Sequence, residues 1–398
     1  MASIRILHAS DLHISVHKQL RSPIDKLRDL DDPSDELARR VAAALRSSPK
    51  IFFTAWWKRM YVSSCDAQIL EDLAEFIYEN ARIKLDGGIE ITEDGEEKLD
   101  AVVLTGDLAT TGSTDDIEQT RKFLRARFNP ERPHKSNEDD YSGATLSAVK
   151  VPVLYLPGNH DRYVFTRDWY GFSPKFFTPG GTEFDRLLSD YRQHPIQSIE
   201  LTAEVSKDKK LKTVILAADL ALEQFDDHEG FLGWLAQGKA YSNIRRELRE
   251  ATERLKEQRK EDEILCVLWA VHFPPDYPGC PNESRLLGEE KLIQTANTAG
   301  VSAVLAGHTH KQLNYRNPSM SFRVFCCGTT TQHEPQAMVG GRDELDARKG
   351  NLFQIITVVA DEAGKVKMSA KDFRYSGFGP QSNRRDIPWV EFPSDAEE

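Results

Sequence analysis

Two kinds of hydrophobic pattern follow one another along this chain. Short apolar, β-prone runs that stop at a glycine or a polar residue predict buried strands. They cover residues 4–9, 100–107, 151–156, 211–222, 264–271, 301–306, 322–327 and 352–359. Amphipathic stretches predict helices, which cover residues 35–46, 69–84, 114–127, 231–260 and 289–299. Together these elements predict an α/β fold.

One predicted strand, residues 151–156, leads directly into a group of polar side chains. Pro157-Gly158 ends the strand and allows a tight turn, and Asn159-His160-Asp161 follows at once. Groups just past a rigid strand end are held accurately, and an amide, an imidazole and a carboxylate can ligate a metal or move a proton. Taken alone, the segment fits a polar turn after a core strand equally well.

Four other predicted strands end in the same way. The ligand-capable residues that follow these strands are Asp11 and His13, Asp107, His272, and His308 and His310. The carboxyl ends of strands in an open α/β sheet share one rim, so we expect all five ends to meet there. With Asn159 they supply seven donors, enough for two ions if one carboxylate bridges. Oxygen and nitrogen donors without a thiolate suit Mn, Fe or Zn.

Composition limits the partners and the cellular compartment that we expect for the protein. The net charge of -11 disfavours a general nucleic-acid surface and docking on an anionic membrane. The cysteine count is odd, with no CxxC, and Cys266 and Cys326-Cys327 lie in apolar runs, which predicts buried free thiols. We see no signal peptide and no apolar run as long as a membrane span, so we expect a cytoplasmic protein.

The polar blocks, read in order, resemble the calcineurin-like metallophosphoesterase superfamily. They are Asp11-Leu-His13, Gly106-Asp107, Gly158-Asn-His-Asp161, His272 and Gly307-His-Thr-His310. Their pattern is most similar to the class III cyclic-nucleotide phosphodiesterases. The resemblance implies a four-layer α-β-β-α sandwich of two mixed sheets, with a dimetal site at the carboxyl ends of the strands.

The same resemblance implies roles for individual residues. Asp11, His13, Asp107 and His310 would hold the first ion. Asp107 would bridge to a second ion held by Asn159, His272 and His308. His160 would lie near the leaving group as a proton donor, and Asp161 would orient His160.

These roles predict a metal-dependent phosphohydrolase, specifically a phosphodiesterase that cleaves a small phosphodiester such as a cyclic nucleotide. Attack would come from a hydroxide activated by the two metals. The chain departs from the family pattern at Thr110, where an asparagine is frequent, and in the long spacing between the first two blocks. An Mre11/SbcD-like DNA exonuclease and a phosphomonoesterase are the alternatives. A non-enzymatic binding module is disfavoured because the ligand set is complete.

The predicted domain organisation is one metallophosphoesterase domain over residues 1–360. Insertions are expected at about 14–99, 129–150 and 162–200, and residues 361–398 form a C-terminal extension that packs on the body. Aromatic residues gather at 51–61 and 163–177. They could form a substrate lid, a dimer contact or ordinary packing, so a homo-oligomer is compatible with the sequence. The expected partner is a small phosphodiester; nucleic acid is not favoured and no membrane is expected.

Overall fold

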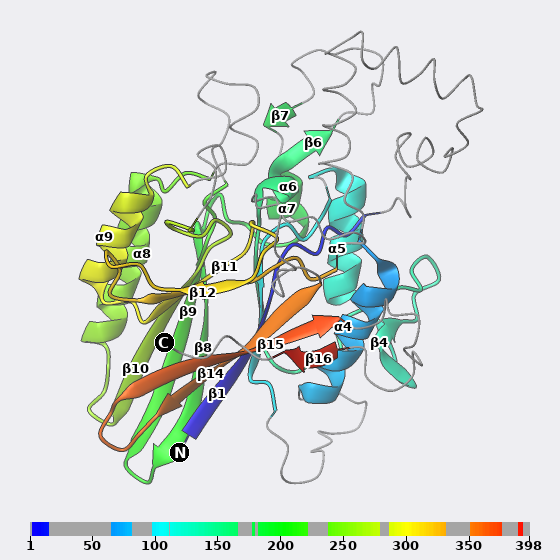
Figure 1. The fold of residues 1–398 in the computed structure, drawn as a ribbon. Helices are drawn as coiled ribbons and strands as arrows, with labels where there is room; N and C mark the ends of the chain where they lie inside the picture. The colour runs from blue at the N-terminus through cyan, green and yellow to red at the C-terminus, as the bar shows by residue number, and fades with distance from the viewer. Residues whose placement is uncertain are drawn as a thin grey trace, which may run out of the picture.

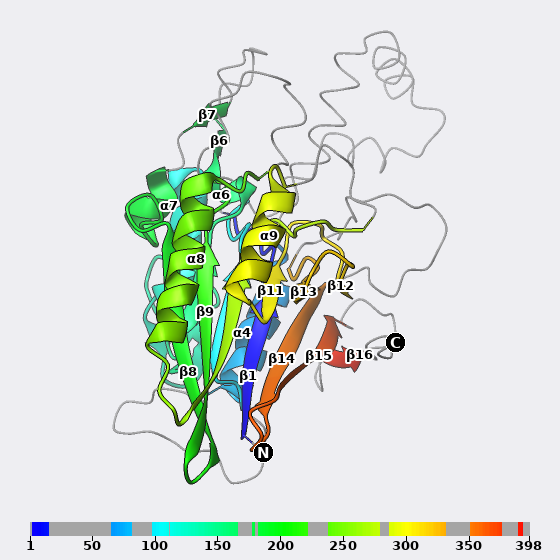
Figure 2. The ribbon, with the colours of Figure 1, turned by 90° about the vertical axis from the view of Figure 1, so that its left-hand side faces the viewer.

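The computed structural model describes ten stretches of the chain, and every structural statement below refers to them. They are residues 2–15, 65–81, 98–110, 112–165, 177–179, 182–221, 238–278, 286–331, 351–375 and 389–392. They form two six-stranded sheets that face each other, with helices on the outer face of each (Figures 1 and 2). The predicted four-layer α/β sandwich is confirmed.

The first sheet runs in the order β16-β15-β14-β1-β2-β5. Its strands are β1 (Ala2–Ala9), β2 (Ala101–Thr105), β5 (Val153–Leu156), β14 (Leu352–Ala360), β15 (Val366–Tyr375) and β16 (Trp389–Phe392). β1, β2 and β5 are parallel, whereas β14, β15 and β16 are joined to the sheet by antiparallel pairs. The described part of the expected C-terminal extension therefore continues this sheet as β15 and β16.

The second sheet runs in the order β12-β13-β11-β10-β9-β8. Its strands are β8 (Ile196–Ser206), β9 (Lys209–Ala218), β10 (Glu263–Ala270), β11 (Ala303–Ala306), β12 (Leu313–Tyr315) and β13 (Arg323–Cys326). β9, β10, β11 and β13 are parallel. Both sheets are therefore mixed. The parallel strands form one half of the first sheet and the centre of the second, and their carboxyl ends share one rim.

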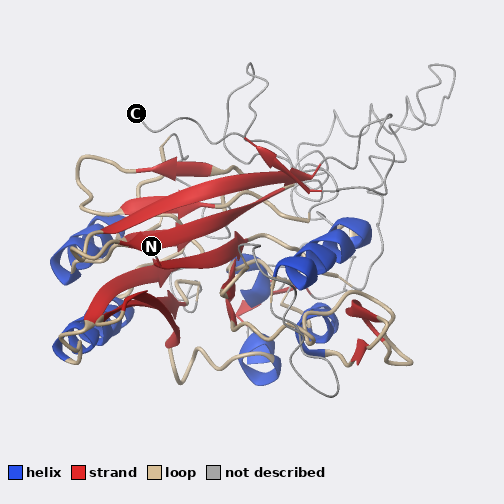
Figure 3. Ribbon diagram, turned by 90° about the horizontal axis from the view of Figure 1, so that it is seen from below, coloured by secondary structure: helices blue, strands red, loops and turns tan. Residues whose placement is uncertain are grey.

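Helices cover the two outer faces. α4 (Ala67–Asn80) and α5 (Thr114–Arg125) lie on the first sheet, and α8 (Ser242–Glu257) and α9 (Glu289–Ala299) on the second (Figures 2 and 3). Local sequence sets several ends. The Asp66 carboxylate accepts from the backbone N–H of Gln68, and Gly300 ends α9 in a left-handed conformation at φ 64°.

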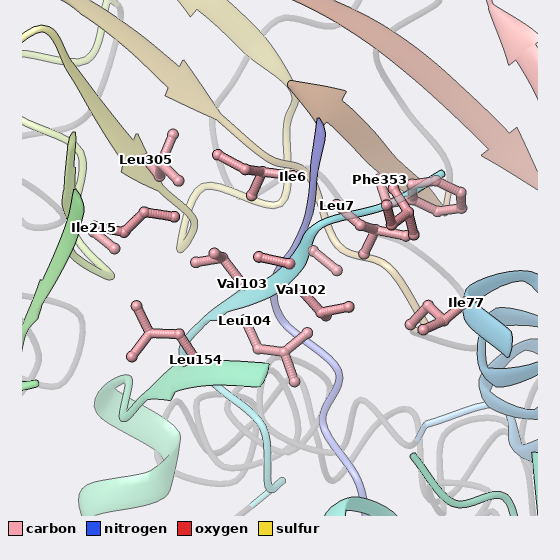
Figure 4. Close-up of a cluster of buried hydrophobic side chains, with 14 of the residues drawn as sticks. Ile6, Leu7, Ile77, Val102, Val103, Leu104, Leu154, Ile215, Leu305 and Phe353 are labelled. Carbon is pink, nitrogen blue, oxygen red and sulfur yellow. The ribbon is translucent and has the colours of Figure 1, made fainter. Parts of the chain in front are cut away.

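Successive side chains of β1 point to opposite faces of the first sheet. Ile6 lies on the side of Leu305 in the second sheet, while Leu7 lies on the side of Ile77 in α4 (Figure 4). Each of these side chains is at most 1% exposed. The same strand therefore contributes to the sandwich interior and to the helix interface, as expected of a strand covered on both faces.

Smaller elements fill the other connections. They are the hairpin β3 (Phe128–Asn129) and β4 (Arg132–Ser136), the short helix α6 (Asn159–Arg162), the ribbon β6 (Tyr163–Phe165) and β7 (Phe177–Pro179), and α7 (Thr182–Leu187). The hairpin occupies part of the stretch 129–150 that the sequence predicts as a loop. None of the described helices is long and apolar enough to cross a membrane.

The expected helix over residues 231–260 is too long at its N-terminal end. Residues 238–241 are described and are not helical; α8 begins at Ser242. Lys239 forms a bridge with Leu287, and the backbone N–H of Ala240 donates to the Leu287 carbonyl oxygen. This extended pairing uses the backbone groups that a helix would need. The predicted helix at 35–46 and the aromatic stretch 51–61 lie outside the described residues.

Candidate metal centre

The five predicted strand ends converge on the rim where the parallel strands of both sheets terminate. Asp11, Asp107, His272 and His308 each come two residues after the last residue of β1, β2, β10 and β11. Asn159 follows β5 at the start of α6. All seven predicted ligands are buried, the most exposed being His310 at 7%. The first sheet supplies four of them and the second sheet three.

The backbone at these strand ends is left-handed. Six described residues other than glycine have positive φ, and five of them are predicted ligands: Asp11, His13, Asp107, His308 and His310. Such a conformation is costly for a residue with a Cβ and persists only where the surroundings impose it. Local strain is thus concentrated on the residues that point their donors into the rim.

Hydrogen bonds hold these turns against one another. The backbone N–H groups of Asp11 and His13 donate to the carbonyl oxygens of Gly106 and Asp107, at 3.0 and 2.9 Å. Across the two sheets, the backbone N–H of His308 donates to Asp11 Oδ2 at 3.1 Å. The rim is therefore one connected network before any side chain ligates a metal.

The donors fall into two groups that share one carboxylate. Asp11, His13, Asp107 and His310 form the first group, and Asp107, His272 and His308 the second; within each, the donor atoms lie within 4.8 Å of one another. His310 Nε2 is 3.2 Å from Asp11 Oδ1 and 3.4 Å from His13 Nε2. In the second group His272 Nε2 lies 3.3 Å from Asp107 Oδ2.

Asn159 completes the second group. Its Oδ1 lies 3.0 Å from His272 Nε2, so the amide oxygen faces the same space as the imidazole and the shared carboxylate. His272 Nδ1 is 2.7 Å from the Thr105 carbonyl oxygen. That bond places a proton on Nδ1 and leaves Nε2 as the donor toward a metal, the arrangement found at most histidine ligands.

Buried atoms without hydrogen-bond partners show that the two groups suit cations. His13 Nδ1, His308 Nε2 and His310 Nδ1 are among the buried side-chain atoms that lack such a partner in the described structure. Leaving polar atoms unpaired in the interior is unfavourable unless a ligand satisfies them. Oxygen and nitrogen donors without sulfur match Mn, Fe or Zn. The two groups of donors fit a dinuclear metal site.

The electrostatics of the rim favour anionic aspartates. Although burial opposes its charge, neighbouring His272 and His160 hold the pKa of Asp107 well below its usual range. Burial alone would lower the pKa of His272, but the Asp107 carboxylate outweighs it and raises that pKa to about 9. A cation bound beside Asp107 would take the place of the Nε2 proton of His272. Burial lowers the pKa of His308 to about 3, which keeps this imidazole neutral and able to ligate.

The structure places His160 beside the first group but changes the expected role of its neighbour. The His160 and His13 rings meet edge to face, with centroids 4.7 Å apart. His160 Nδ1 is 2.9 Å from the Thr110 carbonyl oxygen, and the backbone N–H of His160 donates to Asp107 Oδ1 at 2.8 Å. Thr110, at which the chain departs from the family pattern, therefore orients the ring.

The expectation that Asp161 orients His160 is wrong. Its carboxylate instead accepts three backbone N–H groups, those of Leu108, Ala109 and Gly158, at 3.1, 2.7 and 2.8 Å. A carboxylate directly after His160 in a tight helical turn points away from that ring and toward the turn after β2. Asp161 thus fixes the two loops that carry Asp107 and Asn159 against each other.

A buried histidine of β1, His8, also supports this rim. His8 lies on the sandwich face of β1, with Nε2 2.9 Å from Thr105 Oγ1 and Nδ1 3.0 Å from Gln354 Nε2. The Thr105 carbonyl oxygen also receives the Ser10 hydroxyl, at 3.1 Å. His8 is fully buried in the core, and it supports the end of β2, where the Thr105 carbonyl oxygen accepts from His272.

A family model for calcineurin-like phosphoesterases matches residues 4–312. A dimetal phosphatase from Danio rerio is 11% identical, with a TM-score of 0.44 over 92% of this chain and 95% of that one. GAP50, the anchor in the inner membrane complex of Plasmodium, is 11% identical, with a TM-score of 0.44 over 100% and 91%. NAD nucleotidase from Haemophilus influenzae is 12% identical, with a TM-score of 0.30 over 99% and 61%.

None of the curated proteins matches the chain. The family model nevertheless spans most of the sequence and includes every predicted ligand. The chain therefore belongs to the calcineurin-like phosphoesterase family and is a metal-dependent hydrolase of phosphoric ester bonds.

Proposed function

We propose that this protein is a phosphodiesterase that hydrolyses a small phosphodiester such as a cyclic nucleotide. The observation that carries the proposal is the meeting of two donor groups at one buried rim, with Asp107 common to both. In this proposal Asp11, His13 and His310 complete one metal site, and Asn159, His272 and His308 complete the other.

Two bound cations would neutralise the phosphate charge and make hydroxide available near neutral pH. The residues of the chain set the position of that chemistry. Asp107 draws the two sites together, and its Oδ1 is fixed by the backbone N–H of His160. The turn that contributes Asn159 and His160 is thereby tied to the shared carboxylate.

His160 is the proposed proton donor. An alkoxide that leaves phosphorus needs a proton, and imidazole is the side chain best matched to neutral pH. The Thr110 carbonyl oxygen holds Nδ1–H, which directs Nε2 to the opposite side of the ring. This role matters most for a diester of an aliphatic alcohol, because such a leaving group is a strong base.

A small substrate is favoured over nucleic acid by charge. The chain carries 63 acidic and 52 basic residues, and a DNA-binding groove would need a basic surface. In our proposal the partner is a free phosphodiester, neither nucleic acid nor a membrane takes part, and a homo-oligomer is compatible with the site.

The test is a substrate panel with added Mn²⁺. It compares cyclic nucleotides, bis(nitrophenyl) phosphate, nitrophenyl phosphate, and single- and double-stranded DNA. We expect the highest kcat/KM on cyclic nucleotides or the bis-ester. Asp107→Ala serves as the background control, and Glu253→Ala, on an exposed face of α8, as the surface control. Cleavage of DNA alone would reject the proposal in favour of an exonuclease, and cleavage of the monoester alone in favour of a phosphomonoesterase.

A further inference from the structure

Arg162 is a buried cation that none of the proposed chemistry uses. It is the last residue of α6, the turn that begins with Asn159 and His160, and it is 2% exposed. Its guanidinium binds Asp185 of α7 through both oxygens, with Nη1 to Oδ2 at 2.5 Å and Nη2 to Oδ1 at 3.0 Å. A two-pronged contact of this kind fixes the orientation of the guanidinium plane as well as its position.

The second partner of Arg162 belongs to the other sheet. Arg162 Nε donates to Asp219 Oδ2 at 3.0 Å, and Nη2 donates to the same oxygen. Asp219 comes directly after β9 and is 0% exposed. Its other oxygen accepts the backbone N–H of Ala221 at 2.7 Å. One arginine thus joins the turn after β5 in the first sheet to the end of β9 in the second.

This link is close to the second donor group. β9 pairs in parallel with β10, the strand that delivers His272. Asn159, three residues before Arg162, places its Oδ1 3.0 Å from His272 Nε2. Asn159 and His272 therefore approach each other from different sheets. Their separation depends on how the turn after β5 is held against the carboxyl ends of β9 and β10.

The same residue closes the base of the ribbon that rises above α6 (Figure 1). β6 begins directly after Arg162, and α7, which carries Asp185, follows β7. Arg192 Nε also contacts Asp185 Oδ2, at 3.2 Å. Arg162 consequently fixes α6 from two directions, through Asp185 of α7 and through Asp219 of the second sheet.

The contacts of Arg162 with Asp185 and Asp219 are buried ion pairs, whose energy depends strongly on their geometry. Burial raises the pKa of Asp219, and Arg162 partly offsets that effect by pairing with the carboxylate. Buried carboxylates and a buried guanidinium are tolerated only when their geometry is nearly ideal. Apolar residues of similar size would fill this space without the cost of desolvating charges. Packing alone therefore does not explain these ion pairs, whereas a need to fix the position of α6 does.

We propose that Arg162 is a positioning residue for the dinuclear centre, which holds Asn159 and His160 in register with His272 through its contacts to Asp185 and Asp219. The proposal rests on the two-metal function described above. Loss of the contact between Arg162 and Asp219 should weaken the second metal site, which contains Asn159. It should have little effect on the site formed by Asp11, His13 and His310.

The test measures metal binding directly in four variants of the full chain. Arg162→Lys keeps the charge but loses the two-pronged geometry, and Asp219→Asn keeps the shape but weakens the link between sheets. Arg186→Lys and Glu183→Gln are matched controls, because they alter an ion pair of 2.5 Å on α7 whose arginine is 58% exposed. Mn²⁺ stoichiometry and stepwise affinity come from calorimetry and elemental analysis, with the midpoint of thermal unfolding recorded for each variant.

We expect Arg162→Lys and Asp219→Asn to bind the first ion with wild-type affinity and the second about 10- to 100-fold more weakly. On a nitrophenyl ester kcat falls while KM changes little, and raised Mn²⁺ restores part of the rate. The two controls match the wild type in every measurement.

Two results would overturn the proposal. Wild-type affinity for both ions in Arg162→Lys and Asp219→Asn would reduce Arg162 to an ordinary buried ion pair. Equal loss of both ions together with a lower unfolding midpoint would mean that the variants act on the fold and not on one site. Because metal binding is read without a substrate, failure of the phosphodiesterase assay in the wild type would reject the proposed function and leave this test decisive.

Discussion

Gly158→Ala is the most direct test of the rim, because it changes the metal centre without altering a predicted ligand. Gly158 lies between β5 and Asn159, and its backbone N–H donates to Asp161 Oδ2 at 2.8 Å. A Cβ built on Gly158 would lie 2.2 Å from Asp107 Oδ1, 2.5 Å from Asp107 N and 2.8 Å from His272 Nε2. One methyl group thus meets the shared carboxylate and a second-group imidazole together.

The size of the effect follows from these distances. Contacts of a real Cβ below 3.0 Å are essentially absent, so the Asp107 oxygen must retreat by about 0.8 Å or the turn must open by as much. Metal–ligand distances tolerate roughly 0.2 Å. We therefore expect metal affinity to fall by at least about 100-fold, since that shift exceeds the tolerance several times over. A misplacement near 1 Å also costs on the order of 10²-fold in kcat.

The assay combines elemental analysis of the purified protein, Mn²⁺ titration and hydrolysis of bis(nitrophenyl) phosphate. Gly364→Ala is the control: it lies in a turn far from the rim, and a Cβ there would meet nothing within 4 Å. Its positive φ costs roughly 1–2 kcal/mol of stability without touching the metal centre. Two bound ions and wild-type turnover in Gly158→Ala would refute the placement of Asp107 between the two sites.

Three further predictions concern the proton donor, the core histidine and the metals. His160→Ala should keep both ions but lower kcat by about 10²- to 10⁴-fold on an alkyl phosphodiester. On a nitrophenyl ester, whose leaving group needs no proton, the loss should be much smaller; equal losses on both substrates would argue against a proton donor. Burial lowers the pKa of His8 to about 3, so only the unfolded chain gains its proton as pH falls below about 6.5. The stability due to neutral His8 is complete above that pH and is lost toward pH 3; from pH 7.5 to 5 the loss is about 2 kcal/mol. In urea unfolding, His8→Asn should show a pH dependence smaller by that amount, and an unchanged slope would contradict it. Removal of metal with a chelator should abolish hydrolysis and lower the free energy of unfolding by about 4 kcal/mol for each ion, or about 8 kcal/mol for both, relative to Mn²⁺ at 1,000 times the Kd of each site. Hydrolysis that survives exhaustive chelation would exclude a metal-dependent reaction.

Local sequence was enough to identify most of the strands and their polar ends. A buried strand needs a continuous apolar run, and a left-handed turn after it needs a small number of residue types. Asp107 and His308 were recognisable because each follows such a run at the same short distance. Asp219 comes directly after β9 but lies inside the apolar run 211–222, so the sequence pattern does not mark it as a strand end. The strands β8 and β15 were missed because their exposed alternate positions interrupt any apolar run.

Roles that depend on neighbours distant in sequence were not accessible in this way. Asp161 is adjacent to His160 in the chain, which favours a contact between them, yet the turn directs its carboxylate to the backbone of residues 108 and 109. His160 is held instead by Thr110, 50 positions earlier. Adjacency in sequence does not decide which way a side chain points once a helical turn begins.

The sequence by itself determined that seven donors stand at the ends of apolar strands, because strand and turn are local properties of the chain. Only the tertiary structure decided how these donors are grouped. Asp11 Oδ2 accepts the backbone N–H of His308 across 297 positions because two separate sheets pack face to face. The order of strands in each sheet, and the packing of β5 against β9, bring Asn159 to His272 and Arg162 to Asp219. Such pairings follow from the packing of whole layers, which no local pattern records.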